Sequence, residues 1–241
     1  MVKPRLRATP TPDIARRDFD RAARLLLPCP PLICHLVEPG TPPLHWLACG
    51  APAAGPGVLL YLHGGAYIAG GPQTHAGLVG RLCAMTGLRA ALPAYRLAPE
   101  HPAPAALEDA LAAHAALLAK GIRPADIRLA GDSAGAGLAL ALLAELCRRD
   151  ARPGRVALFS PWADLTGRAQ SLRRNAAADP LLPVERFADV VGYVRGGLAP
   201  EDPRLSPVFA RFAAPPPTLI QAGTTEIVAD DALAAAEALR A

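Results

Sequence analysis

The stretch AGDSAGAG, residues 130–137, lies between two segments of contrasting pattern. The apolar run at 127–133 predicts a buried strand, and the Ala/Leu-rich run at 136–149 predicts a helix. The stretch contains the pattern G-x-S-x-G, which between a strand and a helix exposes a serine hydroxyl at the top of a sheet. Ser133 is therefore a candidate nucleophile, and the amide of Ala134 is a candidate oxyanion donor. The alternative is a glycine-rich turn that merely connects the strand to the helix.

A second glycine motif, LHGGAY at 62–67, follows another apolar run. Two consecutive glycines can turn their backbone N–H groups toward one point, because no side chain blocks a close approach. Gly64 and Gly65 are therefore further candidate oxyanion donors. A tight turn without function is the alternative for this motif alone, but the two motifs together are more specific than either one.

The rest of the chain alternates between short apolar runs and Ala/Leu-rich runs with helical periodicity. Strands are predicted at 44–49, 58–63, 87–95, 127–133, 155–161 and 218–223. Helices are predicted at 11–27, 75–86, 105–120, 136–149 and 184–195. This alternation indicates the α/β class: a mostly parallel sheet with helices on both faces, and a site beyond the carboxyl ends of the strands. The Pro- and Arg-rich region 162–217 breaks the rhythm and is interpreted as an excursion over the sheet, such as part of a lid.

The composition limits the class of protein. The chain has 241 residues, of which 51% are hydrophobic, which suits one large α/β domain or two small ones. Its 25 basic and 21 acidic residues are interleaved without a basic stripe, so nucleic acid is not an expected partner. The arginines of the first predicted helix indicate a solvated face, with a weak contact to an anionic surface as the alternative: Arg16, Arg17, Arg21 and Arg24.

The five cysteines show neither CxxC nor metal-ligand spacing, which predicts free thiols and no metal site. The N-terminus lacks the apolar segment of a signal peptide, and no run approaches the ~18 apolar residues that span a bilayer. These features favour a cytoplasmic protein without a membrane span.

Six motifs in their order resemble the hormone-sensitive-lipase-like family of α/β-hydrolases, which contains many bacterial carboxylesterases. They are HGGAY (63–67), AYRLAPEHPAPAALED (94–109), GDSAGAG (131–137), SPWADLTG (160–167), DPRLSPVFA (202–210) and PTLIQAGTTEIVADDAL (217–233). The resemblance implies an α/β-hydrolase fold with a small cap, and hydrolysis of short- to medium-chain esters without a cofactor. It also implies that Ser133 is the nucleophile, that Gly64, Gly65 and Ala134 form the oxyanion hole, and that His63 anchors its loop.

The resemblance extends over nearly the whole chain and implies one α/β-hydrolase domain, 1–241. Residues 1–50 are expected to supply an N-terminal cap helix and the first strand region, and residues 162–200 a cap excursion. The expected partner is a small-molecule ester. A homodimer is left open as the state of assembly.

The acid of the site should follow the strand predicted at 218–223, because triad order in α/β-hydrolases is serine, acid, histidine. The candidates there are Glu226, Asp230 and Asp231. The family pattern D-P-L-x-D places Glu226 at the position of the catalytic acid and gives Asp230 a role in holding the loop. A charge at a helix N-terminus is the alternative role for Glu226. Asp132, beside the nucleophile, is expected to brace the turn.

A histidine that could activate the serine is not found where the family carries it. All six histidines precede Ser133: His35, His45, His63, His75, His101 and His114. The family's base lies a helix and a strand beyond the acid. The chain is therefore expected to lack the last strand, the base and the last helix, and to show at best trace esterase activity. A downstream reading frame that contains the histidine would indicate a fragment.

Two other functions remain open. One is a non-catalytic small-molecule binding protein, as in the plant gibberellin receptors, which resemble this family and lack the catalytic histidine. The other is an amidase or deacetylase that uses the same machinery. Fold alone does not decide among these functions.

Overall fold

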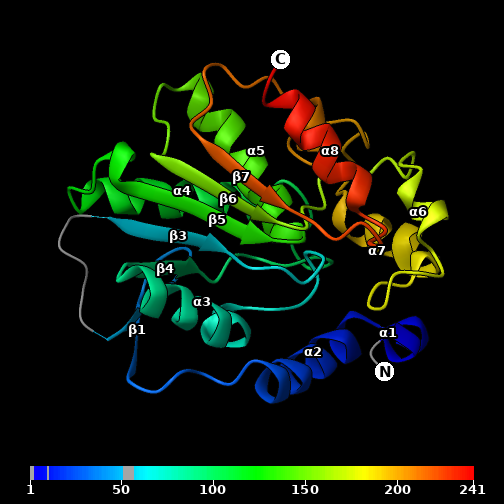
Figure 1. Ribbon diagram of the computed structural model, residues 1–241, viewed down its shortest axis with the longest axis horizontal. Helices are drawn as coiled ribbons and strands as arrows, with labels where there is room; N and C mark the ends of the chain where they lie inside the picture. Colours follow the sequence, from blue (N-terminus) through cyan, green and yellow to red (C-terminus); the bar gives the residue numbers. More distant parts are fainter. Residues whose placement is uncertain (1–2, 10, 51–56) are drawn as a thin grey trace.

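The computed structural model of the protein describes residues 3–9, 11–50 and 57–241. Its centre is a seven-stranded sheet in the order β1-β2-β4-β3-β5-β6-β7 (Figure 1). The strands are β1 (Ile33–Glu38), β2 (Leu44–Cys49), β3 (Val58–Leu62), β4 (Arg89–Pro93), β5 (Ile127–Asp132), β6 (Arg155–Phe159) and β7 (Thr218–Gln221). β2 pairs antiparallel with β1 and β4, and all the other pairs are parallel. The predicted mostly parallel sheet is confirmed.

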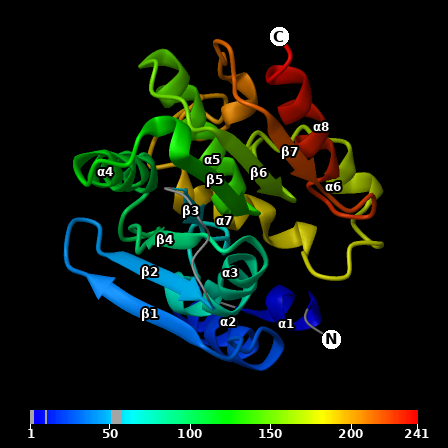
Figure 2. The same cartoon turned by 60° about the vertical axis from the view of Figure 1, so that its left-hand side comes forward.

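Helices cover both faces of this sheet (Figure 2). α3 (Pro72–Thr86) packs on one face, and α4 (Ala105–Ala119), α5 (Ala134–Arg148) and α8 (Ala229–Ala238) belong to the core of the other. β3 shows why both faces are needed, because all of its side chains are buried. Val58, Leu60 and Leu62 point into the core with α4 and α5, whereas Leu59 and Tyr61 point into the core with α3. This period-two division is that of a parallel strand covered on both sides.

Three short elements were not expected from the sequence: α1 (Lys3–Ala8), β1 and α6 (Ser171–Arg174). β1 is an edge strand whose four central residues are all exposed, so it carries no apolar alternation. α1 and α6 span fewer than two helical turns, which is too short for a periodic pattern. The helix expected at 184–195 is a 3₁₀ turn, Val184–Arg186, followed by α7 (Phe187–Val194).

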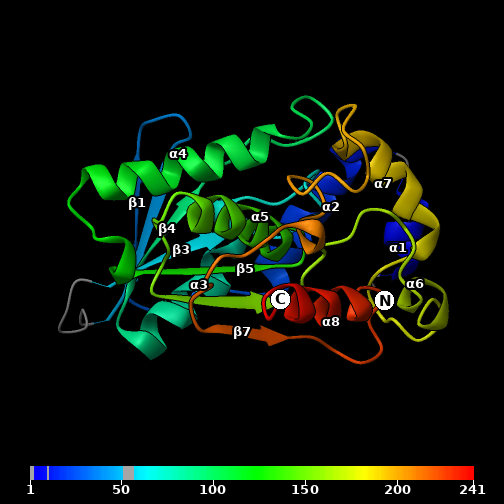
Figure 3. The same cartoon turned by 90° about the horizontal axis from the view of Figure 1, so that it is seen from above.

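The N-terminal helices and the excursion meet beyond the carboxyl ends of the strands (Figures 1 and 3). Lys3 Nζ of α1 donates to the carbonyl oxygens of Ala176 (2.6 Å) and Asp179 (2.7 Å). Arg7 forms an ion pair of 2.7 Å with Glu185. Segments far apart in the sequence thus enclose the edge at which a site of this fold is expected.

One arginine of α2 (Pro12–Leu26) differs from the solvated face predicted for it. Arg17 and Arg21 are exposed, but Arg16 turns inward and donates to the carbonyl oxygens of Ile68 (2.8 Å) and Ala98 (2.9 Å). It also pairs with Glu100, so it fastens α2 to loops near the site. The side chain of Arg24 lies outside the described part of the structure.

All five cysteines are free thiols: Cys29, Cys34, Cys49, Cys83 and Cys147. Among the helices of the described segments, none combines the length and the apolar character needed to cross a membrane.

Candidate active site

Ser133 lies on the sharp turn between β5 and α5, in a backbone conformation that L-residues rarely adopt. Its φ is 51° and its ψ is −122°, which carries a strain of about 1–3 kcal/mol that the surrounding structure must hold. The Ser133 N–H donates to the Phe159 carbonyl oxygen (2.8 Å), and its own carbonyl oxygen accepts from the Trp162 N–H (3.0 Å). Both partners lie at the end of β6, so the neighbouring strand holds the turn in place.

Glycines on either side let β5 and α5 pass close to β3. A Cβ on Gly135 would collide with the carbonyl oxygens of Leu62 and His63, and a Cβ on Gly131 would collide with that of Gly135. The small residues of G-x-S-x-G are therefore required by close backbone approach. The close approach of these backbones helps to place Ser133 at the edge of the sheet.

The hydroxyl of Ser133 is partly exposed and has no hydrogen-bond partner among the described residues. Ala134 is the first residue of α5, so its N–H has no partner within the helix. The helix dipole adds positive potential at the same point. A developing negative charge beside Ser133 would be stabilised there.

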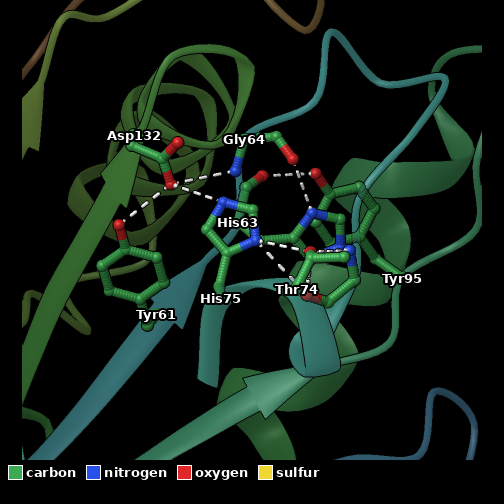
Figure 4. Close-up of polar contacts among 8 residues, drawn as sticks. Tyr61, His63, Gly64, Thr74, His75, Tyr95 and Asp132 are labelled. Atoms are coloured by element: carbon green, nitrogen blue, oxygen red, sulfur yellow. Dashed lines mark hydrogen bonds and ion pairs between the residues drawn. The ribbon is translucent and has the colours of Figure 1, made fainter. Parts of the chain in front are cut away.

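The HGG loop differs from the prediction at Gly64 (Figure 4). The Gly64 N–H donates to Asp132 Oδ1 at 2.9 Å, so it is not free to bind an oxyanion, and its assignment as an oxyanion donor is wrong in this structure. Gly65 has a φ of 124°, where a Cβ would collide with the Ala69 carbonyl oxygen. Within the described segments, the N–H groups of Gly65 and Ala66 have no hydrogen-bond partner.

Asp132 joins the HGG loop to the nucleophile turn. Its Oδ1 accepts from the Gly64 N–H and from the Tyr61 hydroxyl (2.9 Å), and it lies 3.3 Å from His75 Nε2 (Figure 4). Burial favours the neutral carboxyl, but these donors outweigh it and hold the pKa of Asp132 below its ordinary value. Sequence reasoning assigned Asp132 to the turn but missed Tyr61 and His75, which lie on β3 and α3.

His63 is buried beneath the same loop. Its ring stacks on Tyr95 with a centroid separation of 4.1 Å, and its Nδ1 lies 2.8 Å from the Gly64 carbonyl oxygen. The Tyr95 hydroxyl donates to the His63 carbonyl oxygen (2.6 Å). Burial lowers the pKa of His63 to about 3, so the ring stays neutral. These contacts support the loop and do not reach Ser133.

Glu226 lies in the loop between β7 and α8, at the same edge of the sheet as Ser133. Its Oε1 accepts from the Ser160 hydroxyl (2.9 Å) and from the Gly223 N–H (2.8 Å). Its Oε2 is buried and has no partner among the described residues. β5 and β7 flank β6, so the loops that carry Ser133 and Glu226 begin ~10 Å apart, two strand spacings.

The histidines all contact groups other than these two residues. His35 and His45 lie on β1 and β2 and bond to each other, and His63 and His75 belong to the network around Asp132. His114 lies in α4, and His101 lies in the loop before α4. In the part of the chain that the structure describes, none hydrogen-bonds to Ser133 or Glu226.

A model of the family described as the α/β hydrolase fold matches residues 59–241 of the sequence, well over half of its length. The chain belongs to the α/β-hydrolase family. The fold and the family predicted from the motifs are both confirmed.

Curated relatives of this hydrolase carry esterase and acetyl-hydrolase names. An esterase of Acinetobacter venetianus is 40% identical over 183 residues, which cover 75% of the chain and 60% of that protein. An acetyl-hydrolase of Streptomyces hygroscopicus is 42% identical over 183 residues with the same coverage. The chain thus spans about 60% of the length of these two relatives.

Solved structures give the same family. A crystal structure of an esterase from the bacterial hormone-sensitive lipase family is 35% identical, with a TM-score of 0.91 over 98% of the hydrolase and 80% of that chain. A structure of EstE5 soaked with p-nitrophenyl butyrate is 33% identical, with a TM-score of 0.89 over 96% of the hydrolase and 77% of that chain. These likenesses confirm the resemblance to the hormone-sensitive-lipase-like family.

The other two acid candidates of the hydrolase bind backbone groups. Asp230 Oδ2 accepts from the Ser171 N–H (2.8 Å), and its Oδ1 pairs with Arg174 (2.7 Å). Asp231 Oδ2 accepts from the N–H groups of Ala163 and Asp164, at 2.9 Å each. Both carboxylates therefore fasten the excursion to the start of α8.

We expect the stability of Asp231→Asn, relative to that of the unmodified protein, to increase as the pH rises. Burial raises the pKa of Asp231 to about 7, helped by Asp164 and Asp230 and opposed by the two N–H donors. A pKa above the unfolded value of about 3.9 favours the folded state at low pH, and this stabilisation is lost as the pH rises through about 7. Asparagine can accept the same N–H groups without titrating.

Thermal unfolding at about pH 4 and about pH 8 checks this prediction. The Tm of Asp231→Asn relative to the unmodified hydrolase should rise between the two conditions. Asp230→Asn is the matched control: Arg174 lowers the pKa of Asp230, so its carboxylate is ionised in the folded protein at both pH values and the Tm difference for this variant should change little between them. A Tm difference for Asp231→Asn that is independent of pH would contradict the raised pKa.

Proposed function

We propose that the protein is a carboxylic ester hydrolase that acts on short- to medium-chain esters through an acyl-serine intermediate. The observation that carries this proposal is the pairing of two features at one sheet edge. Ser133 is held in a strained turn at the N-terminus of α5, and Glu226 keeps a buried carboxylate oxygen that has no partner among the described residues. A nucleophile needs a base, and the base needs a group that orients it.

In the proposed reaction, Ser133 Oγ attacks the ester carbonyl carbon while an imidazole removes its proton. The Ala134 N–H and the free N–H groups of Gly65 and Ala66 stabilise the negative oxygen of the tetrahedral intermediate. The imidazolium then protonates the departing alcohol, and water releases the acid from the acyl-serine. The second N–H of the imidazole donates to Glu226 Oε2, which holds the ring and stabilises its charge.

We propose that this imidazole is none of the six histidines described above. The spacing of the two loops supports the proposal, because ~10 Å between strands that flank a third leaves the width of a side-chain ring between serine and carboxylate. The orphan oxygen supports it too, since a buried carboxylate oxygen without a donor is costly.

Free imidazole is therefore expected to accelerate ester hydrolysis by residues 1–241 in a saturable way. The measurement is p-nitrophenol release from p-nitrophenyl butyrate at increasing imidazole concentration. Ser133→Ala serves as the blank, because imidazole cleaves such esters slowly by itself. 1-Methylimidazole is the matched control, since it can accept the serine proton but has no N–H for Glu226. A rate that rises only as fast as the blank would count against the proposed mechanism.

A small-molecule binding protein without catalysis is the second candidate. It is favoured by the placement of all six histidines away from Ser133. The same experiment distinguishes the two candidates, because a binding protein would hold the ester analogue in a calorimetric titration yet show no imidazole-dependent turnover. An acyl anilide in place of the ester would reveal the amidase alternative.

A further inference from the structure

Three buried polar side chains of the excursion share one face of a helical segment. Ser171, Asn175 and Asp179 have exposed fractions of 0%, 6% and 2%. They are spaced by four residues, and backbone hydrogen bonds of 2.9 Å from Asn175 to Ser171 and from Asp179 to Asn175 continue the helical path. Side chains at this spacing lie one above the other. The three face the loop that carries Glu226.

Each of these side chains bonds to the backbone of that loop, residues 223–228, which we call the acid loop. Asn175 Nδ2 donates to the carbonyl oxygens of Thr224 (3.0 Å) and Glu226 (2.7 Å). Asp179 Oδ2 accepts from the Ile227 N–H (2.8 Å), and the Ser171 hydroxyl donates to the Ile227 carbonyl oxygen (2.7 Å). Four backbone groups on either side of the acid are thereby satisfied from outside the loop.

The acid loop contributes little of its own structure at this point. Its backbone hydrogen bonds are turn bonds of 3.1–3.2 Å, from the Glu226 N–H to the Gly223 carbonyl oxygen, from the Ala229 N–H to that of Glu226, and from the Asp231 N–H to that of Val228. Loss of Ser171 or Asp179 would leave a backbone group of the buried residue Ile227 unsatisfied, at a cost of about 1–3 kcal/mol. Loss of Asn175 would leave the Glu226 carbonyl oxygen with the Ala229 N–H alone. The loop would then shift to find water or another partner.

Asp179 has further partners outside the acid loop. Its Oδ1 accepts from the N–H groups of Leu181 and Leu182, at 2.8 Å each, so its carboxylate is fixed from both sides. Lys3 Nζ of α1 donates to the backbone carbonyl oxygen of Asp179. Asp179 therefore connects the N-terminal helix to the acid loop through hydrogen bonds.

We propose that Ser171, Asn175 and Asp179 are positioning residues for the catalytic acid. They touch neither Ser133 nor the Glu226 carboxylate, and they act by fixing the backbone from which Glu226 projects. This inference rests on the proposed function, because it assigns a role through Glu226. The proposal also means that residues 171–179 of the excursion position the catalytic acid and do not form a lid over the substrate.

The test is a double-mutant cycle read by the rate at which a fluorophosphonate labels Ser133, measured by intact mass with imidazole in the buffer. Asn175→Ala should slow labelling roughly 10- to 100-fold, the effect of a misplacement of about 1 Å. The maximal rate should fall, while the reagent concentration at half-saturation stays constant. In the Glu226→Gln background, the same substitution should change the rate less than about threefold, because the two act through one group. Ser171→Ala, which removes a single hydroxyl, provides a milder variant if Asn175→Ala does not fold.

Ser206→Ala is the matched control, because Ser206 is fully buried and bonds to the Leu165 N–H (2.8 Å) of the excursion but not to the acid loop. Hydrogen exchange should show residues 223–228 losing protection in Asn175→Ala and retaining it in Ser206→Ala. Equal fold-losses for Asn175→Ala in both backgrounds, or an acid loop that stays protected, would overturn the positioning role. If Glu226→Gln alone leaves labelling unchanged, the proposed function fails instead.

Discussion

Ser133→Ala is expected to abolish covalent labelling by a fluorophosphonate, because alanine has no oxygen to attack phosphorus. The turn should survive the substitution, since the backbone bonds to Phe159 and Trp162 do not involve the hydroxyl. Hydrolysis of p-nitrophenyl butyrate should fall to the level of the buffer. Where the activating imidazole is present, the loss should be on the order of 10⁶-fold in kcat, the scale observed when the nucleophile of a serine hydrolase is removed.

The control for this experiment is Ser206→Ala, which deletes a buried hydroxyl outside the proposed site. It should lower Tm but keep one equivalent of label per chain. Label retained in Ser133→Ala, or turnover equal to that of the unmodified protein, would remove Ser133 from the mechanism and would reopen the binding-protein alternative.

Glu226→Gln is expected to have the second largest effect. Glutamine can keep an oxygen toward Ser160 and the Gly223 N–H, but its amide group then places an N–H at the position where Oε2 would accept the imidazole N–H. The imidazole loses its orienting acceptor and the charge that stabilises its protonated form. Where that imidazole is part of the protein, kcat should fall by about 10⁴-fold, as when the triad aspartate of a serine protease becomes asparagine. In residues 1–241, the saturable response to imidazole should disappear.

Asp230→Asn is the comparison that assigns the acid. It removes the ion pair with Arg174 and weakens the hydrogen bond from the Ser171 N–H. It should therefore lower Tm, while turnover should fall far less than in Glu226→Gln. Cooperative thermal unfolding of both variants should first show that they are folded, and their turnover rates can then be compared. A larger loss of turnover in well-folded Asp230→Asn than in Glu226→Gln would exchange the two assignments.

The alternation of short apolar runs with Ala/Leu-rich runs along the sequence was sufficient to predict the α/β architecture. The run Val58–Leu62 is buried throughout, which is the pattern of a strand covered on both sides. The long helices follow from Ala/Leu periodicity, and the family model then confirmed the fold. Edge strand β1 could not be predicted in this way, because its exposed residues show no alternation between two environments.

The position of the nucleophile turn was also determined locally. Gly131, Ser133 and Gly135 are close in sequence, and the strain at Ser133 arises from a turn of a few residues between a strand and a helix. The motif therefore places the serine without reference to distant parts of the chain. Chain order left three candidates for the acid after β7, and the family pattern D-P-L-x-D then favoured Glu226 among them.

Only the tertiary structure decided which polar groups are paired. The Gly64 N–H binds Asp132, 68 residues further along, and is thereby lost to the oxyanion hole. One Glu226 oxygen accepts from Ser160 and Gly223, and the other has no partner within the described segments. Asn175 supports the Glu226 backbone from 51 residues away. A sequence shows which donors and acceptors need partners. The choice of partner depends on which segments the fold brings within about 3 Å, and packing of distant elements sets that distance.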